Sequence, residues 1–295
     1  MVETSEFAGR ILCDAALTLG EGPAYDAATD TAWWFNIVGK ELHELHLGSG
    51  VKRVHALPFM GSVLARIDGT RQLIASDAGL FLRDMTSGAL TRYVVLEDGK
   101  PGNRSNDGRV HPSGALWIGT MGRSAETGAG AIYHVAGTAV TRLYDKVSIP
   151  NSICFSPDGA TGYFVDSKVN VMMRVALDPK TGLPAGAPQP FVDAAGGSAD
   201  FDGSVCDAEG HVWNARWGGG AIERYAPDGR LVARHALPAR QTTCPAFIGA
   251  KLDRLLVTSA WQGMDEAMRA ADPQAGFTFE LGIAVKGVAD PLFRL

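Results

Sequence analysis

The sequence has few cysteines, and their positions form no recognisable pattern. Cys13, Cys154, Cys206 and Cys244 are far apart, show no C-x-x-C spacing and stand inside apolar runs. Zinc sites and disulfide frameworks use cysteines at characteristic spacings. We therefore expect buried, reduced thiols rather than metal ligands or disulfides.

Basic clusters, leader segments and long apolar runs are also missing. Lys and Arg total 27 against 32 Asp and Glu, which gives a formal charge of -5. No window interleaves basic with aromatic residues as a nucleic-acid surface requires. The N-terminus lacks the basic region of a signal peptide, and no apolar run approaches the roughly 20 residues that span a bilayer. We expect a soluble cytoplasmic protein with neither nucleic acid nor membrane as a partner.

Long helical periodicity is nearly absent as well, and MDEAMRAA at 264–271 is the main exception, predicted as one short helix or a loop. Short β-rich runs take its place, each behind a cluster of turn residues. Six of these runs recur at steps of 40, 44, 47, 49 and 43 residues, which is the spacing of four-stranded propeller blades. Their central residues are Trp33, Leu73, Trp117, Phe164, Trp213 and Leu256.

Two hairpins per repeat complete the predicted architecture. A tight turn precedes each central run, and a second hairpin often follows, as in ELHELHLGSGVKRVHAL at 41–57 and MMRVALDPKTGLPAG at 172–186. The fold class is therefore all-β, a six-bladed β-propeller. Propellers close by pairing the two chain ends in one blade. We expect GRILCDA at 9–15 to complete the sheet of FELGIAVKG at 279–287, with residues 1–295 forming a single domain.

Oxygen-bearing side chains occupy one register of this repeat. Innermost strands start at a common face around the central channel, so residues in equivalent positions converge there. Four of the six blades carry such a side chain at this position. In the other two blades the matching positions fall near Gly61 and Cys244, which offer no oxygen ligand. The four polar residues are Glu21, Asn106, Asn151 and Asp202, which lie 12, 11, 13 and 11 residues before their central residues.

Each of these residues, taken alone, also suits a turn. Asn-Asp-Gly in GNRSNDGRV at 102–110 is good turn chemistry. The occurrence of four such residues at the same end of the channel favours a binding site over four separate turns. An unpaired carboxylate in a narrow channel would also be costly to desolvate. Glu21 and Asp202 with Asn carboxamides would supply charge and oxygen ligands for one divalent cation. Such ligands admit calcium, magnesium, manganese, iron(II) or zinc.

At these residues the chain resembles the gluconolactonase/regucalcin (senescence marker protein) family of six-bladed propellers. The resemblance implies metal-dependent hydrolysis of a sugar lactone, an aldono- or aldarolactone, to the open-chain sugar acid. It assigns the metal to Glu21, Asn151 and Asp202, general-base catalysis to Asp202, and substrate binding to Arg104 and Asn106. The matching motifs are L-G-E-G-P at 19–23, N-R-x-N-D-G at 103–108, L-W-I-G-T-M at 116–121, P-N-S-I at 150–153, S-P-D-G at 156–159 and D-G-S-V-x-D-A-E-G-x-V-W at 202–213.

Arg216 departs from the family pattern, which has a small or apolar residue there. We interpret it either as a solvated side chain at a blade rim or as a substrate-binding cation that pairs with the far carboxylate of an aldarolactone. The second interpretation predicts that glucaro- or galactarolactone is hydrolysed at least as well as gluconolactone. The loop MGRSAETGAG at 121–130 is expected at the same face, as a mobile lid or as plain polar surface.

A non-catalytic calcium-binding or scaffold propeller is the second hypothesis, because a fold alone does not fix a function. Convergent oxygen ligands beside Arg104 favour the enzyme. A serine hydrolase is disfavoured, since Ser152 lacks the G-x-S-x-G context of a nucleophile elbow. The sequence leaves open the sugar, its ring size and the oligomeric state.

Overall fold

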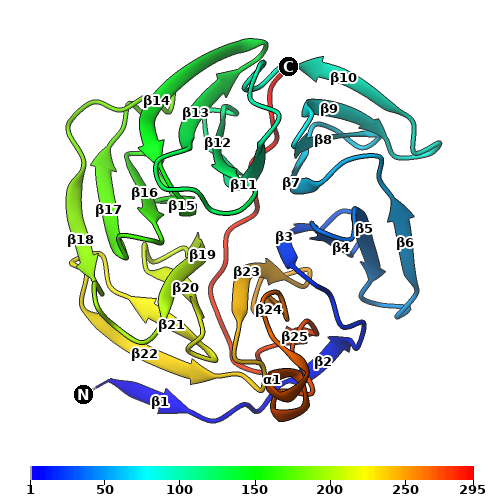
Figure 1. Cartoon of the computed structure of the whole chain (residues 1–295), viewed down its shortest axis with the longest axis vertical. Helices are drawn as coiled ribbons and strands as arrows, with labels where there is room; N and C mark the ends of the chain where they lie inside the picture. Colours follow the sequence, from blue (N-terminus) through cyan, green and yellow to red (C-terminus); the bar gives the residue numbers. More distant parts are fainter. Residues whose placement is uncertain (1) are drawn as a thin grey trace.

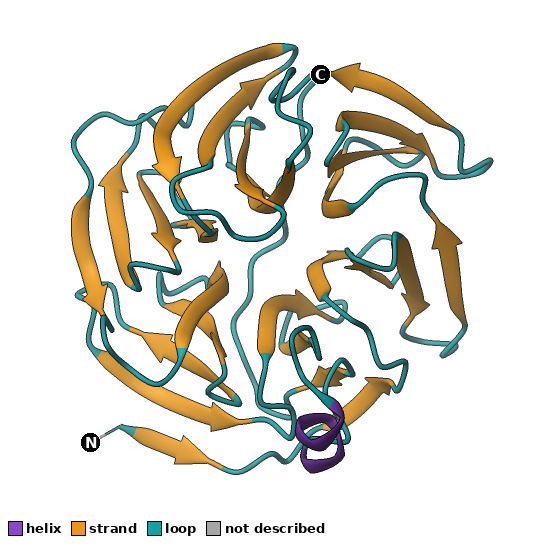
Figure 2. Cartoon of the chain, in the orientation of Figure 1, coloured by secondary structure: helices purple, strands orange, loops and turns teal. Residues whose placement is uncertain are grey.

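The structure, a computed structural model, describes residues 2–295 as six antiparallel sheets arranged radially around a central channel (Figures 1 and 2). The blades follow one another in chain order, which confirms the six-bladed propeller. The innermost strands of blades 1 to 6 are β3 (Gly20–Asp26), β7 (Gly61–Arg66), β11 (Asn103–Val110), β15 (Pro150–Phe155), β19 (Asp200–Cys206) and β23 (Thr242–Ile248). The second strands are β4 (Thr31–Asn36), β8 (Arg71–Ser76), β12 (Leu116–Gly122), β16 (Thr161–Asp166), β20 (Val212–Trp217) and β24 (Arg254–Ser259).

The outer half of each blade is a second hairpin in blades 1 to 5 and is shared between the chain ends in blade 6. The third strands are β5 (Glu41–His46), β9 (Gly79–Asp84), β13 (Gly130–Ala136), β17 (Val171–Ala176), β21 (Ala221–Tyr225) and β25 (Thr278–Glu280). The outermost strands are β6 (Lys52–Ala56), β10 (Leu90–Val94), β14 (Ala139–Val147), β18 (Gln189–Asp193), β22 (Leu231–Ala236) and β2 (Arg10–Cys13).

Closure occurs in blade 6, where β2 from the start of the chain pairs antiparallel with β25 near its end. This is the predicted pairing, although β25 is shorter than the FELGIAVKG run. From residue 281 onward the chain leaves the sheet. A short strand, β1 (Glu3–Ser5), adds a fifth strand to blade 5 by pairing parallel with β22. The short helix α1 (Glu266–Ala271) lies in the predicted 264–271 segment, with the Asp265 side chain accepting a hydrogen bond from the Met268 amide.

The central strands are apolar on both faces because neighbouring blades pack face to face. Every residue of β4 and of β12 is buried. Trp117, for example, meets Phe155 of the next blade edge to face, with ring centroids 5.4 Å apart. In the predicted MMRVALDPKTGLPAG hairpin, Leu177 bridges Pro184 antiparallel, and the ladder of β17 then continues with Gln189–Asp193 beyond that segment. All four cysteines are buried and free, as predicted.

The last fifteen residues form a segment that we call the C-terminal strap (281–295). Figure 1 shows it running from blade 6 across the centre of the ring to the C-terminus beside β10 and β14. Its amides bond to Leu255 of blade 6, to Arg66 at the end of β7 and to Gly114 of blade 3. Because Arg66 ends an inner strand, the strap lies at the end of the channel opposite the strand starts. We call the strand-start end the mouth.

No helix within residues 2–295 is long and apolar enough to cross a membrane.

Candidate active site

A pocket of about 370 Å³ opens at the mouth of the channel, where the inner strands begin. Glu21, Arg104, Asn106, Asn151 and Asp202 all line it, so the structure brings together five of the six residues predicted from the sequence. GNRSNDGRV is not a turn, because residues 103–110 form the inner strand β11. The prediction that strand starts converge is therefore correct for these residues.

A bulge interrupts every inner strand close to the pocket. The pairing with the second strand shifts register between Glu21 and Ala24, between Ser105 and Gly108, between Asn151 and Cys154, and at the same level in the other three blades. A bulge re-aims side chains and is common beside active sites. Within one of them, Gly22 has a φ of 55°, and a Cβ there would lie 2.0 Å from the Ser62 carbonyl oxygen. This explains the second glycine of LGEGP.

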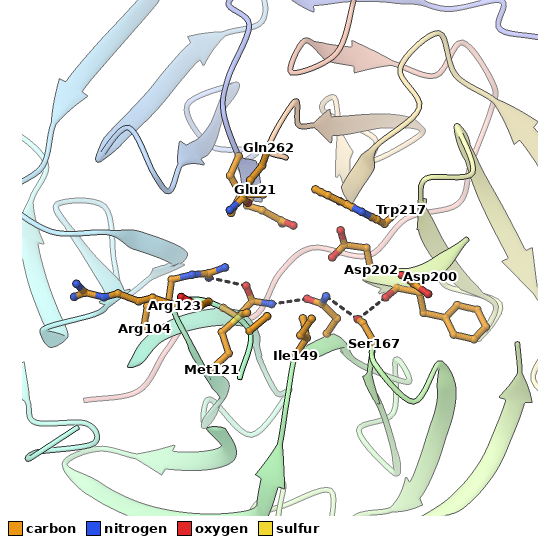
Figure 3. A pocket seen from close by; sticks show the side chains of 16 residues that line it. Glu21, Arg104, Met121, Arg123, Ile149, Ser167, Asp200, Asp202, Trp217 and Gln262 are labelled. Carbon is orange, nitrogen blue, oxygen red and sulfur yellow. Dashed lines mark hydrogen bonds between the residues drawn. The ribbon is translucent and has the colours of Figure 1, made fainter. Parts of the chain in front are cut away.

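The carboxyl groups of Glu21 and Asp202 point toward one another in the pocket (Figure 3). Burial and the negative charge of nearby Asp107 raise the pKa of Glu21 to about 8. Burial, Glu21 and Asp107 likewise raise the pKa of Asp202 well above its usual range. Arg104 opposes both shifts, but it is the weaker influence. Both carboxyl groups are therefore harder to ionise at the mouth than in water.

A row of hydrogen bonds crosses the pocket from blade 3 to blade 5, drawn as dashed lines in Figure 3. Arg104 Nη1 donates to Asn106 Oδ1 at 2.7 Å, and Asn106 Nδ2 donates to Asn151 Oδ1 at 2.7 Å. Asn151 Nδ2 donates to Ser167 Oγ at 3.0 Å, and Ser167 Oγ donates to the Phe201 carbonyl at 2.7 Å. Every donor points the same way along the row. The side chains of Asn106 and Asn151 are therefore both oriented with Oδ1 toward Arg104 and Nδ2 away from it.

The backbone carbonyl of Asp202 accepts two side-chain hydrogen bonds, which fix the position of this residue. Ser152 Oγ donates to the Asp202 carbonyl at 2.6 Å, and Asn214 Nδ2 donates to the same oxygen at 3.0 Å. Ser152 is fully buried and has a φ of 56°, which is uncommon for a residue other than glycine. Its hydroxyl thus has a structural partner, which agrees with the prediction that it is no nucleophile.

Arg216 does not line the pocket, contrary to the substrate-binding interpretation. Its guanidinium lies over the Phe201 ring, 4.1 Å from the centroid, and Nη2 donates to the Ala199 carbonyl at 2.7 Å. The next residue, Trp217, lines the pocket instead. Successive side chains of a strand point to opposite faces, so a shift of one residue exchanges the two. Arg216 is buried, so the solvated-rim interpretation is wrong too.

Several pocket residues were missed by the sequence analysis. Trp217 and Gln262 border the pocket from blades 5 and 6, and Arg123 stands at its rim in an ion pair with Asp77 at 2.7 Å. The 121–130 loop contributes Met121, Arg123 and neighbours, as its position after β12 predicted. Gly128 N donates to Ser148 Oγ at 3.2 Å, so the loop is tied to the connection between β14 and β15. The one sequence signal that could have identified Trp217 is the alternation of side-chain direction along β20.

A second cluster with metal-ligand chemistry lies outside the pocket, in blade 5. The ligand atoms of Asp207, Glu209 and His211 lie within 4.8 Å of one another. Arg224 already occupies this cluster, because Nη2 donates to Asp207 Oδ2 at 2.7 Å and to Glu209 Oε2 at 2.9 Å. Trp213 Nε1 also donates to Asp207 Oδ2, at 2.8 Å. A cation there would have to displace the guanidinium.

Comparison with known proteins identifies the class to which this fold and pocket belong. The SMP-30/Gluconolactonase/LRE-like region model matches residues 19–261. The chain therefore belongs to this family, which confirms the predicted resemblance.

Individual relatives are similar over nearly all of the chain. A Rhizobium meliloti (strain 1021) protein named "Putative sugar lactone lactonase" is 65% identical over 100% of both chains. The L-arabinolactonase of Azospirillum brasilense is 35% identical over 96% of this chain and 94% of its own. Among solved structures, a calcium-binding protein, regucalcin, from Agrobacterium tumefaciens has a TM-score of 0.99, 63% identity and 100% coverage of both chains. The predicted hydrolase acting on lactone esters agrees with the names of the first two.

Proposed function

We propose that the protein is a hydrolase that opens a sugar lactone to the corresponding sugar acid, with one divalent metal ion at the channel mouth. Membership of the family and the names of the lactonase relatives support the reaction class. The single observation that carries the metal-assisted form is the pair of facing, buried carboxyl groups, Glu21 and Asp202, whose pKa values are raised first by burial and then by neighbouring carboxylates.

The donor set fits a divalent cation. Glu21 and Asp202 would hold it with their carboxylates, and Asn151 with Oδ1, whose second lone pair is free beside the bond from Asn106. All three are hard oxygen ligands of the kind that calcium and magnesium prefer. When bound there, the ion would supply Lewis-acid polarisation of the lactone carbonyl or activation of water. Similarity to the calcium-binding regucalcin of Agrobacterium tumefaciens supports calcium as the first ion to test.

Asp202 would act as the general base. Its buried carboxylate would take the proton of the water whose oxygen adds to the lactone carbonyl carbon, and that proton would pass to the ring oxygen as the ester C–O bond breaks. The hydrogen bonds from Ser152 and Asn214 to its backbone would fix its position.

Arg104 and Asn106 would bind the substrate. Arg104 is buried in the pocket wall, and burial lowers its pKa to about 10, at which it is still charged near neutrality. Its Nη1 makes both bonds that fix it within the described chain, to the Ser105 carbonyl and to Asn106. The donors on Nε and Nη2 would remain for sugar hydroxyls or for the oxyanion that develops on the carbonyl.

The test is acid release from a panel of aldono- and aldarolactones, followed in a pH-stat with calcium, magnesium, manganese, iron(II) or zinc added after chelation. We expect turnover above spontaneous hydrolysis with at least one metal and loss of turnover on chelation. No acceleration of any lactone by any of the metals would contradict the proposal.

A non-catalytic calcium-binding role is the alternative, supported by the same similarity to the Agrobacterium tumefaciens regucalcin. It would use the same oxygen ligands without Arg104 or Asn106. Calcium binding in calorimetry, combined with no lactone turnover under any metal, is the result that would favour it.

A further inference from the structure

Charged residues follow one another from the C-terminal strap along β11 toward the mouth, with Asp290 paired to Arg109 and Arg109 close enough to Asp107 to lower the pKa of its carboxyl group against the effect of burial. Asp290 of the strap pairs with Arg109 of β11, Oδ1 to Nη1 at 2.7 Å. The Arg109 side chain is 13% exposed and that of Asp290 is 33% exposed, so the arginine end of this ion pair lies within the propeller. Breaking one partner of a buried pair leaves an uncompensated charge that has to find a new partner.

Asp107 is the next group along β11 and lies between Arg109 and the pocket. Its Oδ1 accepts the Gly108 amide at 2.8 Å, and its Oδ2 accepts the Ile153 amide of β15 at 2.7 Å. The second bond crosses from blade 3 to blade 4 and ends inside the bulge of β15. That bulge includes Ser152, with its positive φ, and begins at Asn151.

The strap itself is firmly seated, so it can hold Asp290 in place. Phe293 is 1% exposed and packs in the core between blades 2 and 3, where it joins Val110 and Leu116. The Phe293 amide donates to the Arg66 carbonyl at 2.7 Å, and the Ala208 amide of blade 5 donates to Lys286 O at 2.7 Å. The strap is thus fixed on both sides of Asp290.

We propose that Asp290 is a positioning residue for the metal site at the opposite end of the channel, acting through Arg109 and Asp107 on the β15 bulge that aims Asn151. This inference rests on the proposed function. Without the Asp290 carboxylate, Arg109 turns to the nearest remaining carboxylate, Asp107, and competes with the Ile153 amide for Oδ2. The β15 bulge then loses the hydrogen bond from the Ile153 amide to Asp107, and the Asn151 carboxamide is no longer held in one orientation.

The experiment compares two ion pairs of the same strap. Asp290→Asn breaks the inward pair, and Lys286→Gln breaks the outward pair between Lys286 and Glu209, whose atoms lie 2.5 Å apart. Lys286 is 71% exposed, so its pair is expected to contribute little. Asp290→Glu keeps the charge and serves as the rescue variant.

We expect Asp290→Asn to weaken calcium binding in calorimetry by about tenfold and to lower kcat more than it raises KM for the lactone. Lys286→Gln should match the wild type, and Asp290→Glu should recover most of the affinity. A structural role alone would instead lower Tm in Asp290→Asn and leave calcium affinity and the kcat/KM balance unchanged, which would overturn the proposal.

Amide hydrogen exchange provides a measurement that needs neither metal nor turnover. The Ile153 amide should exchange faster in Asp290→Asn than in Lys286→Gln, because only the first disturbs its acceptor. Equal protection of this amide in the two variants would overturn the proposal even if lactonase activity were established. If no lactone is hydrolysed but Ile153 loses protection, the proposed function fails and the coupling stands.

Discussion

The two ends of the central channel solve the problem of buried charge differently. At the far end, Arg109 meets Asp290 of the strap at 2.7 Å, so opposite charges compensate one another within the chain. At the mouth, Glu21 faces Asp202, and both pKa values are raised, first by burial and then by neighbouring carboxylates. Compensated charge is typical of a structural region, whereas shifted pKa values gather at functional sites. The contrast favours the mouth as the candidate functional end of the channel.

The same contrast appears in how each end is covered. The strap crosses the far end and inserts Phe293 into the core, while the mouth stays open as a pocket of about 370 Å³. If the comparison is right, changes at the mouth should abolish chemistry and leave folding intact. Changes elsewhere should act indirectly and more weakly.

The largest expected effect is that of Asp202→Asn. Loss of the general base and of one metal ligand should reduce kcat/KM at least about 100-fold, since general-base catalysis alone contributes 10²–10⁴-fold. Circular dichroism and thermal unfolding should remain close to wild type. The matched control is Asp200→Asn, two residues earlier on the same strand and also at the pocket, which should retain most activity. Wild-type turnover in Asp202→Asn would contradict the assignment of the base.

Next come Arg104→Ala and Asn106→Ala. Removing a donor to the developing oxyanion should lower kcat by roughly 100-fold, whereas removing a contact made equally in the ground state should only raise KM. Steady-state kinetics on the best lactone distinguishes the two roles. Because Arg104 also fixes Asn106, the double variant should lose less than the sum of the two single losses. Unchanged kinetics in both single variants would remove these residues from the site.

The pH dependence of stability tests the raised pKa of Glu21 at the mouth directly. In metal-free protein, folded Glu21 keeps its proton up to about pH 8, whereas the unfolded chain loses it near the ordinary value of 4.5. The folded state thus binds more protons across this window, and its stability should fall as pH rises through it. Calcium binds the ionised carboxylates, so it should raise Tm more at about pH 8 than at about pH 5.

Glu21→Gln is the control for this experiment, since it removes the titrating carboxyl group. Both the fall in Tm with pH and the pH-dependent gain from calcium should diminish in this variant. An identical pH profile in wild type and variant would show that Glu21 has an ordinary pKa.

The smallest and most selective effect is expected from two arginines, Arg123 at the pocket rim and Arg216 in β20. Arg123 lines the rim and has donors beyond its bond to Asp77, so Arg123→Leu should weaken an aldarolactone relative to an aldonolactone by several-fold. Arg216 supports Phe201 and the Ala199 carbonyl from outside the pocket. Arg216→Leu should therefore reduce kcat/KM equally for both substrates. A selective loss in Arg216→Leu would mean that its side chain reaches the substrate.

Much of this site could be predicted from the sequence, because blade repeats place equivalent residues at one end of the channel. The spacing of the central strands indicated the register of Glu21 and Asp202, and convergence followed from topology. Arg216 could not be placed the same way, since one residue along a strand decides which face a side chain takes. Its neighbour Trp217 faces the pocket.

The strap was also beyond sequence-based prediction. FELGIAVKG has the composition of a strand, yet only Thr278–Glu280 pairs in the sheet. Beyond it, Val285 and Gly287 donate to the carbonyls of Asp253 and Leu252 in a turn, at 3.1 and 2.9 Å. These long-range bonds depend on where the completed ring places that turn. Local pattern carries no information about that position.

The bulges have one more consequence. They recur in all six inner strands, including β7 and β23, where the register shifts between Gly61 and Val63 and between Thr242 and Pro245. The bulge therefore belongs to the scaffold rather than to the polar residues at the mouth. A lineage built on this ring could therefore change its chemistry by substitutions in any of the six inner strands, because each already carries a bulged backbone at the same level.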